Sequence, residues 1–489
     1  RSTLFPYTTL FRSGRRGLPY MEFRGRDVEV SHITYDSRKV CPGSLFVAIQ
    51  GYDTDGHQYI SQAEEKQAAC LLVEKPVESS LPQVIVEDGR KALAYVSAIF
   101  FNHPSKEMKV VGITGTKGKT TVSNLLYQMA KTAGRNPGRI GTNGVAYADI
   151  NYPIFHTTPE SSELQEILRN MRDKGVDTVF IEVSSGGLKL SRVEQIQFDI
   201  GVFTNFSRDH IGLKEHANME EYLYWKSTLF ENTPVSILNF DEKVYSVLRE
   251  RVKDQMFSYG IHGGDIQAKE IVYGKKINEH THFMYCGKST FSVELCNPGE
   301  FSVYNALAVL AVGELLEYPV FAMQDTLKQG HVLGRIELLP APDNYCVVLD
   351  YAHNGTSLEQ ILRILKGYHP RRLLCVMGSI GGRARLRRKE LGDVAAKFCD
   401  TVVLTTDNPD FEDPITIIND IKESFFGTSV QVYEEPNRAE AVCLALSLME
   451  EGDILLLAGK GHEEYQLIRG EKVPYSDKEV VNGYFSHLK

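Results

Sequence analysis

Apolar residues recur along this chain in short runs that alternate with amphipathic segments. In the first hundred residues the runs lie at 44–49, 68–73 and 83–86, with an amphipathic segment at 59–67. Later in the chain, five apolar runs alternate with helical patterns, at 345–349, 373–377, 401–405, 430–433 and 453–457. Regular alternation of strand and helix indicates mostly parallel sheets with right-handed crossovers. We therefore predict an α/β fold.

The middle of the chain contains an apolar run that ends in a glycine-rich loop. Residues 108–122 have the sequence MKVVGITGTKGKTTV, and a helical pattern follows at 122–131. Glycines let backbone N–H groups surround phosphate oxygens, and the positive end of the helix dipole faces the anion. We predict an ATP site in which Lys119 contacts the outer phosphates and the Thr120 hydroxyl binds Mg²⁺, the alternative being a glycine-rich turn that binds nothing. The residues assigned to ATP here are Gly115, Thr116, Lys117, Gly118, Lys119, Thr120 and Thr121.

Two further strands of this region end in polar residues that suit the same site. The run TVFIEV at 178–183 carries Glu182 near its end, and the run FDIGVFTN at 198–205 leads to His210. In open parallel sheets, ligands bind at the carboxyl ends of the strands. We expect Glu182 to bind Mg²⁺ or to orient its water ligands, and His210 to contact metal or phosphate. The alternatives are an acid that ends a strand by chance and a histidine that is hydrogen-bonded in a loop.

Lys226 lies among aromatic residues in the helical pattern YLYWKSTLF at 222–230. A buried ammonium group is destabilising unless a partner compensates its charge. The sequence therefore implies an acidic neighbour or a covalent modification of this lysine.

Length and composition limit the class of protein. A chain of 489 residues suggests about three domains, and 42% hydrophobic and 24% charged residues are ordinary for a globular protein. The 54 basic and 63 acidic side chains give a net charge of -9, which disfavours nucleic acid as a partner. No apolar stretch approaches the roughly 18 residues of a membrane span. The eight cysteines lack CxxC spacing, and we interpret them as reduced core residues of a cytoplasmic protein.

The start of the chain follows neither a helical nor a strand period. Its segment LFPYTTLFRS, Leu4 to Ser13, resembles the translation of a sequencing-library adapter, so we interpret residues 1–20 as non-native. A cationic targeting peptide is the alternative, which Pro6 and the lack of a clean apolar core disfavour. The expected domains are then 21–105, whose own start is truncated, 106–333 and 334–489.

Eleven short motifs, in this order, resemble the Mur ligase family, and most closely its MurE type. The likeness runs from about Val28 to Lys489. The motifs are YDSRKV (35–40), TGTKGKTT (114–121), HTTPES (156–161), EVSS (182–185), TNFSRDH (204–210), YWKSTLF (224–230), YNALAV (304–309), GRIE (334–337), DYAHN (350–354), DNP (407–409) and GKGHE (459–463). Their number and order, more than any one motif, make the resemblance specific.

The resemblance implies an N-terminal domain for the uridine nucleotide, a central P-loop ATPase domain and a Rossmann-like C-terminal domain. It also implies an ATP-dependent amide ligase of peptidoglycan precursor synthesis, which adds the third residue to UDP-N-acetylmuramoyl-L-alanyl-D-glutamate through an acyl phosphate. The implied partners are these small molecules and Mg²⁺, and the expected state is a cytoplasmic monomer.

The resemblance also assigns roles to single residues. Catalysis falls to Lys119, Glu182, His210 and Lys226, the last as a carbamyl-lysine, with Thr120, Glu182 and His210 around Mg²⁺. Nucleotide contacts include Asn305, Arg335 and Asp350. Ser37 contacts the uridine end, and Thr157, Thr158, Ser184 and Arg192 hold the muramoyl-peptide. The incoming amino acid is bound by Arg383, Asp407, Asn408, Asp410, Gly459 and Glu463.

The chain departs from the family pattern at two informative positions. Relatives that add meso-diaminopimelate have arginine as the fourth residue of DNPR, where this chain has Asp410. An acid there would repel a distal carboxylate and attract an ammonium group, so we expect L-lysine or ornithine as the added residue. The alternative is that Asp410 faces solvent and that diaminopimelate is still used. Gly186 replaces the histidine of EVSSH, which leaves open a ligase with a different acyl substrate or an inactive binding paralogue.

Overall fold

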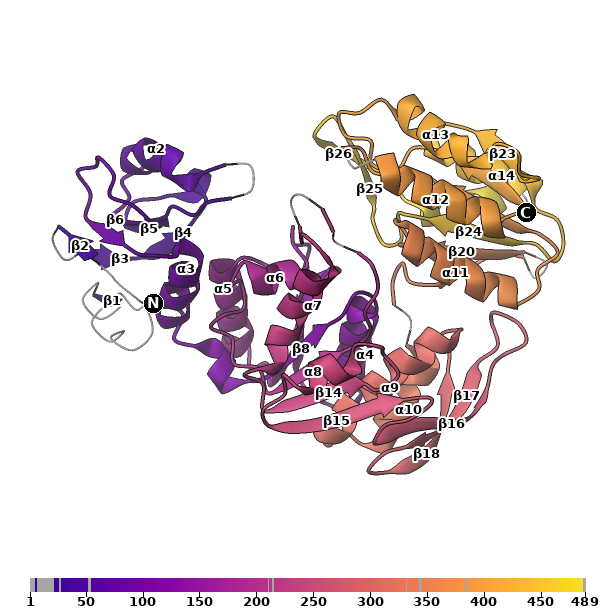
Figure 1. The fold of residues 1–489 in the computed structure, drawn as a ribbon, viewed down its shortest axis with the longest axis horizontal. Helices are drawn as coiled ribbons and strands as arrows, with labels where there is room; N and C mark the ends of the chain where they lie inside the picture. Colours follow the sequence, from indigo (N-terminus) through magenta and orange to yellow (C-terminus); the bar gives the residue numbers. More distant parts are fainter. Residues whose placement is uncertain are drawn as a thin grey trace. The chain divides into compact units, whose positions relative to one another are not determined.

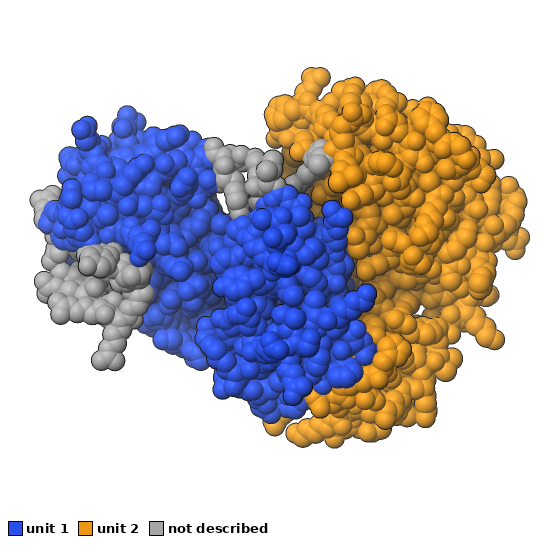
Figure 2. Space-filling view, in the orientation of Figure 1, with its two compact units in different colours: residues 1–259 blue, residues 260–489 orange. Residues whose placement is uncertain are grey.

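The computed structural model describes residues 5–6, 22–25, 28–51, 54–209, 211–212, 215–330, 332–342, 345–382 and 385–486. These residues form two compact units, 1–259 and 260–489 (Figure 2). Most of the segment that we interpret as non-native, together with His210 and Arg383, lies outside the described residues.

The first unit begins with a small α/β domain. Its five-stranded sheet has the order β2 (Glu22–Arg24), β7 (Gln83–Ile85), β6 (Cys70–Val73), β5 (Ser44–Val47) and β4 (His32–Thr34), and only β2 is antiparallel to its neighbour. The helices are α2 (Ile60–Glu65) and α3 (Gly89–Phe100). Alternate strand residues enter two separate cores, with Leu72 packed in the core of Leu93 and Leu71 in the core of Ile60. A short strand, β1 (Phe5–Pro6), pairs with β3 (Glu29–Val30).

A larger sheet forms the rest of the first unit. Its strands follow the order β11 (Ile150–Tyr152), β10 (Gly144–Tyr147), β9 (Pro137–Gly141), β12 (Thr178–Glu182), β8 (Lys109–Thr114), β13 (Ile200–Phe203), β14 (Val235–Asn239) and β15 (Gln255–Gly260). Pairing is parallel from β9 to β15 and antiparallel at β10 and β11. The helices are α4 (Lys119–Thr132), α5 (Ser161–Asp173), α6 (Ser185–Lys189), α7 (Met219–Ser227) and α8 (Tyr245–Arg249). Strand β12 is buried along its whole length, which explains its nearly unbroken apolar sequence.

The second unit starts with an antiparallel ladder and two helices. The strands are β16 (Ile266–Val272), β17 (Thr281–Cys286) and β18 (Thr290–Leu295), followed by α9 (Glu300–Leu315) and α10 (Val320–Gln329). Helix α10 packs against strand β18, and Leu327 and Val293 are buried.

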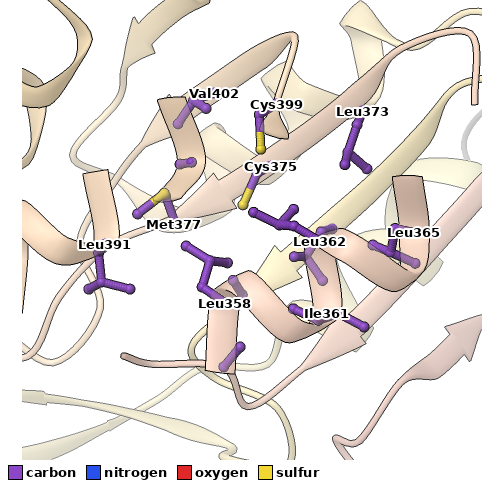
Figure 3. Packing of buried hydrophobic residues seen from close by; sticks show 14 of the residues in the cluster. Leu358, Ile361, Leu362, Leu365, Leu373, Cys375, Met377, Leu391, Cys399 and Val402 are labelled. Carbon is purple, nitrogen blue, oxygen red and sulfur yellow. The ribbon is translucent and has the colours of Figure 1, made fainter. Parts of the chain in front are cut away.

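The remainder of the second unit is a six-stranded sheet between two helix layers (Figure 1). The strand order is β19 (Glu337–Leu339), β20 (Cys346–Asp350), β24 (Ile454–Ala458), β21 (Leu373–Met377), β22 (Thr401–Leu404) and β23 (Gln431–Glu434), and only β19 is antiparallel. The helices are α11 (Gly355–Gly367), α12 (Arg385–Phe398), α13 (Pro414–Lys422), α14 (Arg438–Leu448) and α15 (Asp477–Ser486). Figure 3 shows Leu358 and Leu362 of α11 against Cys375 and Met377 of β21. A hairpin of β25 (Tyr465–Ile468) and β26 (Glu471–Pro474) extends from this sheet's loops.

The predicted α/β class with mostly parallel sheets is confirmed. The antiparallel strands β16 to β18 and the hairpin β25–β26 were not predicted, although Phe291, Val293 and Leu295 of β18 alternate with polar residues. All eight cysteines are free thiols, but Cys41 is exposed, so the expectation that every cysteine lies in a core was wrong for that residue. In the described part of the chain, no helix combines the length and the apolarity that crossing a membrane requires.

Candidate active site

The phosphate loop joins β8 to α4 and is held by the segment that follows β13. Gly115 has a φ of 141°, and a Cβ atom there would collide with the Thr204 side chain, so glycine is required. Thr116 N–H donates to the Asn205 carbonyl at 2.8 Å, and Lys117 N–H donates to Asn205 Oδ1 at 2.9 Å. Gly118, with a φ of 86°, caps the start of α4. The loop therefore has the preformed shape that backbone binding of phosphate needs.

Lys119, Thr120 and Glu182 meet at the end of this loop. Lys119 Nζ donates to the carbonyls of Gly115 and Thr116, at 2.9 and 3.0 Å. Thr120 Oγ1 donates to Glu182 Oε2 at 2.8 Å, and the fully buried Glu182 carboxylate also accepts hydrogen bonds from Ser123 and Thr142. Hydroxyl and carboxylate oxygens are ligands that Mg²⁺ prefers, so this pair fits the predicted metal.

Metal-ligating side chains are otherwise sparse. No group of three or more His, Cys, Asp or Glu side chains that could hold a metal is found in the part of the chain that the structure describes. Because His210 lies outside that part, its predicted role at the metal stays a prediction. Its neighbour Asp209 pairs with Lys117, with 2.9 Å between Oδ2 and Nζ.

Lys226 of α7 is buried against the same loop. It is 1% exposed, its Nζ donates to the Gly115 carbonyl at 2.7 Å, and it lies 4.6 Å from the centre of the Tyr222 ring. Burial, followed by the positive charge of Lys119, holds the pKa of Lys226 well below its ordinary value. A neutral amine that is poised at the phosphate loop is also the form that reacts with CO₂.

A pocket of about 220 Å³ gathers the residues that the sequence assigns to the muramoyl-peptide. Six of the predicted residues line it, namely Lys119, Thr157, Thr158, Ser184, Arg192 and Lys226. Thr158 Oγ1 donates to the Glu182 carbonyl at 2.8 Å and lies 3.0 Å from Ser184 Oγ, so the peptide residues are joined directly to the end of β12. Ser37 does not line this pocket and is buried at the start of a short 3-10 helix in the N-terminal domain.

His216 lines the same pocket, and sequence reasoning missed it. Its imidazole is 2% exposed, and its Nε2 lies 2.9 Å from Ser185 Oγ. A Cβ atom on the neighbouring Gly186 would meet nothing within 4 Å, so the missing family histidine leaves open space. Nothing in the local sequence KEHAN distinguishes His216 from a surface histidine, and only the fold brings it to Ser185.

Arg192 is positioned by an acid that the sequence analysis did not select. Glu160, at the start of α5, accepts from Arg192 Nε at 2.9 Å, and it also pairs with Arg90 of α3, with 3.2 Å between Oε2 and the guanidinium. Both Glu160 and Arg192 are largely buried, at 7% and 10% side-chain exposure. Glu160 thus connects the N-terminal domain to the pocket through two charge-assisted bonds.

The nucleotide residues expected outside the loop lie in the second unit. Asn305 is buried in α9, and its Nδ2 has no hydrogen-bond partner among the described residues. Asp350, at the end of β20, accepts from Ile336 N–H at 2.9 Å. The Arg335 guanidinium lies over the Tyr351 ring at 5.0 Å.

The predicted amino-acid residues form a compact cluster around a buried lysine. Lys460 is fully buried, and its Nζ donates to Asn408 Oδ1 at 2.6 Å and to Glu463 Oε2 at 2.9 Å. Asn408 Nδ2 donates to the same Glu463 oxygen at 3.0 Å, and Asp407 Oδ1 lies 3.4 Å from Lys460 Nζ. Burial raises the pKa of Asp407, although Lys460 opposes the shift. The sequence analysis included Lys460 in the GKGHE motif without a role of its own, and the structure shows that it holds DNP and GKGHE together.

Asp410 is occupied by a structural contact. Its Oδ1 accepts from Gly470 N–H at 2.8 Å, at the turn between β25 and β26. Its backbone carbonyl accepts from Arg469 N–H at 2.8 Å. The carboxylate is therefore committed in part to the hairpin, which weakens the argument that its charge alone selects the amino acid.

Comparison with known proteins agrees with this geometry. Models of three domains match the chain: Mur ligase family, catalytic domain (29–113), Mur ligase middle domain (113–313) and Mur ligase, glutamate ligase domain (334–461). A protein from Caldanaerobacter subterraneus subsp. tengcongensis, named UDP-N-acetylmuramoyl-L-alanyl-D-glutamate–2,6-diaminopimelate ligase, is 37% identical over 94% of this chain and 96% of its own length. The chain belongs to the Mur ligase family. Like other Mur ligases it is an ATP-dependent ligase.

Two further relatives have the same activity in their names. The protein from Bacillus velezensis is 37% identical over 93% of this chain and 94% of its own. A solved UDP-N-acetylmuramoyl-L-alanyl-D-glutamate–2,6-diaminopimelate ligase is 25% identical, covers 99% of both chains and has a TM-score of 0.69. The matched domains and these relatives confirm the Mur ligase resemblance seen in the sequence. Mur ligases of this type serve peptidoglycan synthesis.

Proposed function

We propose that this Mur ligase adds meso-diaminopimelate to the D-glutamate carboxylate of UDP-N-acetylmuramoyl-L-alanyl-D-glutamate. The observation that carries the proposal is the 37% identity to a ligase of that name over nearly the whole chain. The names of the relatives favour diaminopimelate, which the sequence analysis held as its alternative, over lysine or ornithine. The hydrogen bond from Gly470 N–H to Asp410 Oδ1 supports this revision, since it gives the Asp410 carboxylate a structural role at the hairpin that does not require a lysine substrate.

The first step is transfer of the γ-phosphoryl group of ATP to the substrate carboxylate. In this proposal the phosphate-loop N–H groups and Lys119 bind the phosphates, and Thr157, Ser184 and Arg192 orient the muramoyl-peptide. Mg²⁺, held by Thr120 and Glu182 with His210, would offset charge on the phosphoryl oxygens. Lys119 must exchange its present carbonyl acceptors for phosphate oxygens.

Lys226 has a part in the same step. We propose that its neutral amine, which the low pKa of Lys226 favours, adds CO₂ and releases one proton to solvent, so that a carbamate anion forms. The carbamate would lie beside Gly115, whose carbonyl Lys226 now contacts, and would accept hydrogen bonds from Lys119 or join the metal ligands. This change removes the electrostatic conflict between Lys226 and Lys119.

The second step is attack of the incoming amine on the acyl phosphate. Glu463 would bind the ammonium form of the amino acid. Lys460 and Asn408 fix the orientation of the Glu463 carboxylate. The ammonium group first loses one proton to solvent and becomes the nucleophilic amine. The C–N bond then forms as the C–O bond to phosphate breaks, and the second proton passes to the departing phosphate or to solvent. Arg383 would hold the α-carboxylate of the same amino acid.

Phosphate release tests the proposal directly. The protein is given ATP, Mg²⁺ and UDP-N-acetylmuramoyl-L-alanyl-D-glutamate, with meso-diaminopimelate, L-lysine or L-ornithine supplied separately. Turnover with meso-diaminopimelate alone, with the tripeptide product seen by mass spectrometry, is the expected result. Turnover with lysine or ornithine alone would refute the choice of amino acid. Failure with all three, while ATP still binds, would point to another acyl substrate.

A further inference from the structure

The turn of the hairpin β25–β26 is hydrogen-bonded to Asp410, which follows the DNP motif of the amino-acid cluster. Figure 1 labels the two strands of this hairpin. Arg469 N–H donates to the Asp410 carbonyl at 2.8 Å, Asp410 N–H donates to the Leu467 carbonyl at 3.0 Å, and Gly470 N–H donates to Asp410 Oδ1 at 2.8 Å. Asp410 and Arg469 are therefore neighbours in space although they lie 59 positions apart in the chain. The negative charge of Asp410 thus occupies the position where the family has arginine, and the backbone of Arg469 is hydrogen-bonded to it.

Arg469 occupies an unusual position for its residue type. It has a φ of 51° and Gly470 a φ of 82°, as in the two-residue turns that favour Asn-Gly or Asp-Gly. A long side chain in the left-handed region is disfavoured, and function often accounts for such residues. Arg469 is exposed, and across the residues that the structure describes its guanidinium forms no hydrogen bond or ion pair. It is available to a ligand.

Neighbouring cations are already engaged. Arg388 is buried and pairs with Glu412 and Asp420, and Lys460 is buried in the amino-acid cluster. Lys472 of the same hairpin lies over the Tyr465 ring at 4.2 Å. Arg469 thus differs from these three in having its whole guanidinium fork exposed to solvent.

The hairpin is continuous with the residues that handle the reacting amine. Leu467 N–H donates to Asn408 Oδ1 at 2.9 Å, and Gln466 Nε2 donates to the Asp407 carbonyl at 2.9 Å. Asn408 in turn donates to Glu463. Strand β25 is therefore joined by hydrogen bonds both to the cluster of Asn408 and Glu463 and to Asp410.

We infer that Asp410 and Arg469 together bind the far end of the incoming amino acid, which carries both a carboxylate and an ammonium group. This inference rests on the proposed function and deepens it. The guanidinium fork of Arg469 matches the distal carboxylate, and the Asp410 carboxylate, whose Oδ1 holds the hairpin, attracts the distal ammonium. The zwitterionic far end of the amino acid would thus bind two side chains of opposite charge, Asp410 and Arg469. Lysine and ornithine lack the distal carboxylate, so they would leave Arg469 without a partner.

Steady-state kinetics with meso-diaminopimelate test the pair. Arg469→Gly removes the guanidinium and relieves the left-handed backbone, so it does not destabilise the turn. Asp410→Asn removes the charge but keeps an oxygen for Gly470. We expect each to raise KM for meso-diaminopimelate about 10- to 100-fold, the range for loss of a charge-assisted hydrogen bond, and kcat to change less than about threefold. Arg469→Lys retains charge without the fork and should lie between Arg469→Gly and the wild type.

Lys472→Ala is the matched control, because it removes a positive charge from the same hairpin. Its KM should stay within about twofold of the wild-type value, as for an exposed charge without a substrate contact. If wild-type protein uses meso-diaminopimelate and Arg469→Gly keeps the wild-type KM, the inference fails while the proposed function stands. If wild-type protein does not use meso-diaminopimelate, both fail. A KM that rises equally in Lys472→Ala would show a general charge effect and would also overturn the inference.

Discussion

At the scale of single residues, the site depends on side chains in environments that sequence alone does not reveal. Lys226 is buried beside Lys119, and Glu182 is buried among hydroxyl and amide donors. Both follow from the way that α4, α7 and β12 converge on the phosphate loop. The surroundings of Lys226 disfavour its positive charge, whereas the donors around Glu182 stabilise its negative charge.

Lys226→Met should abolish phosphate release, since the proposed carbamate cannot form. The same change should raise the melting temperature of bicarbonate-free protein near neutral pH. The pKa of Lys226 is lower in the folded than in the unfolded state, so the unfolded chain binds the extra proton, and stability is lost as pH falls from about 10.4 toward the folded pKa. The increase in melting temperature from Lys226→Met should therefore become smaller as pH rises toward about 10.4. Melting curves at several pH values measure this, and a gain that is independent of pH would contradict it.

Gly115→Ala and Gly186→Ala form a matched pair of glycine substitutions. The Cβ atom on Gly115 would strike Thr204 at a φ of 141°, so we expect a loss of stability of more than about 1 kcal/mol and a large loss of ATP affinity. The Cβ atom on Gly186 enters open space in a helix, where alanine is favoured by about 1 kcal/mol at most. Denaturant unfolding and nucleotide titration would reveal the contrast. Equal behaviour of the two variants would show that the phosphate loop is not shaped as described.

At the scale of secondary-structure elements, function depends on how elements are fastened to one another. Glu160 links the start of α5 to α3 and to Arg192, and Lys460 links the loop after β22 to the loop after β24. Each link is a buried or largely buried charge with more than one partner. Removing one partner would leave the others without compensation.

Glu160→Gln tests the first link. Weakening the bonds that orient Arg192 should raise KM for UDP-N-acetylmuramoyl-L-alanyl-D-glutamate about tenfold with little change in kcat. Glu163→Gln is the control on the same helix, because Glu163 is 37% exposed and its contacts to Lys39 and Tyr35 are 3.2 and 3.4 Å long. It should change KM less than about twofold. An unchanged KM in Glu160→Gln would mean that Arg192 does not need this acid.

Lys460→Met tests the second link. The variant leaves Glu463 and Asp407 without their shared cation in a buried cluster, so the amino-acid site should lose its geometry. We expect at least about a 100-fold loss in kcat/KM for the amino acid, while ATP affinity in the absence of that substrate stays at its wild-type value. Retention of amino-acid affinity would contradict the role given to Lys460.

At the scale of the whole molecule, the residues predicted for the muramoyl-peptide and those predicted for the incoming amino acid lie in different parts of the chain, while those predicted for ATP lie in both. The pocket with Thr157, Ser184 and Arg192 belongs to residues 1–259, and the cluster with Asn408 and Glu463 belongs to residues 260–489. Multidomain chains commonly depart from two-state unfolding. Ligands that bind only one part should therefore stabilise that part selectively.

Calorimetry with separate substrates tests this division. We expect the calorimetric enthalpy to exceed the van't Hoff enthalpy, with at least two overlapping transitions. UDP-N-acetylmuramoyl-L-alanyl-D-glutamate should shift one transition and meso-diaminopimelate the other. A single transition that both ligands shift equally would show that the chain unfolds as one cooperative unit.

The sequence by itself determined the class of fold, the family and six of the thirteen residues that line the pocket. It could do so because the phosphate loop and the buried parallel strands impose strong local requirements, such as glycine at 115 and apolar residues throughout β12. The tertiary structure alone decided which distant residues act together. His216 meets Ser185, Glu160 meets Arg90 and Arg192, and Asp410 meets Arg469 through long-range packing and strand pairing that no local pattern encodes. The expectation of lysine came from the charge of Asp410 taken alone, whereas its hydrogen bond and its neighbour depend on where the chain places the hairpin.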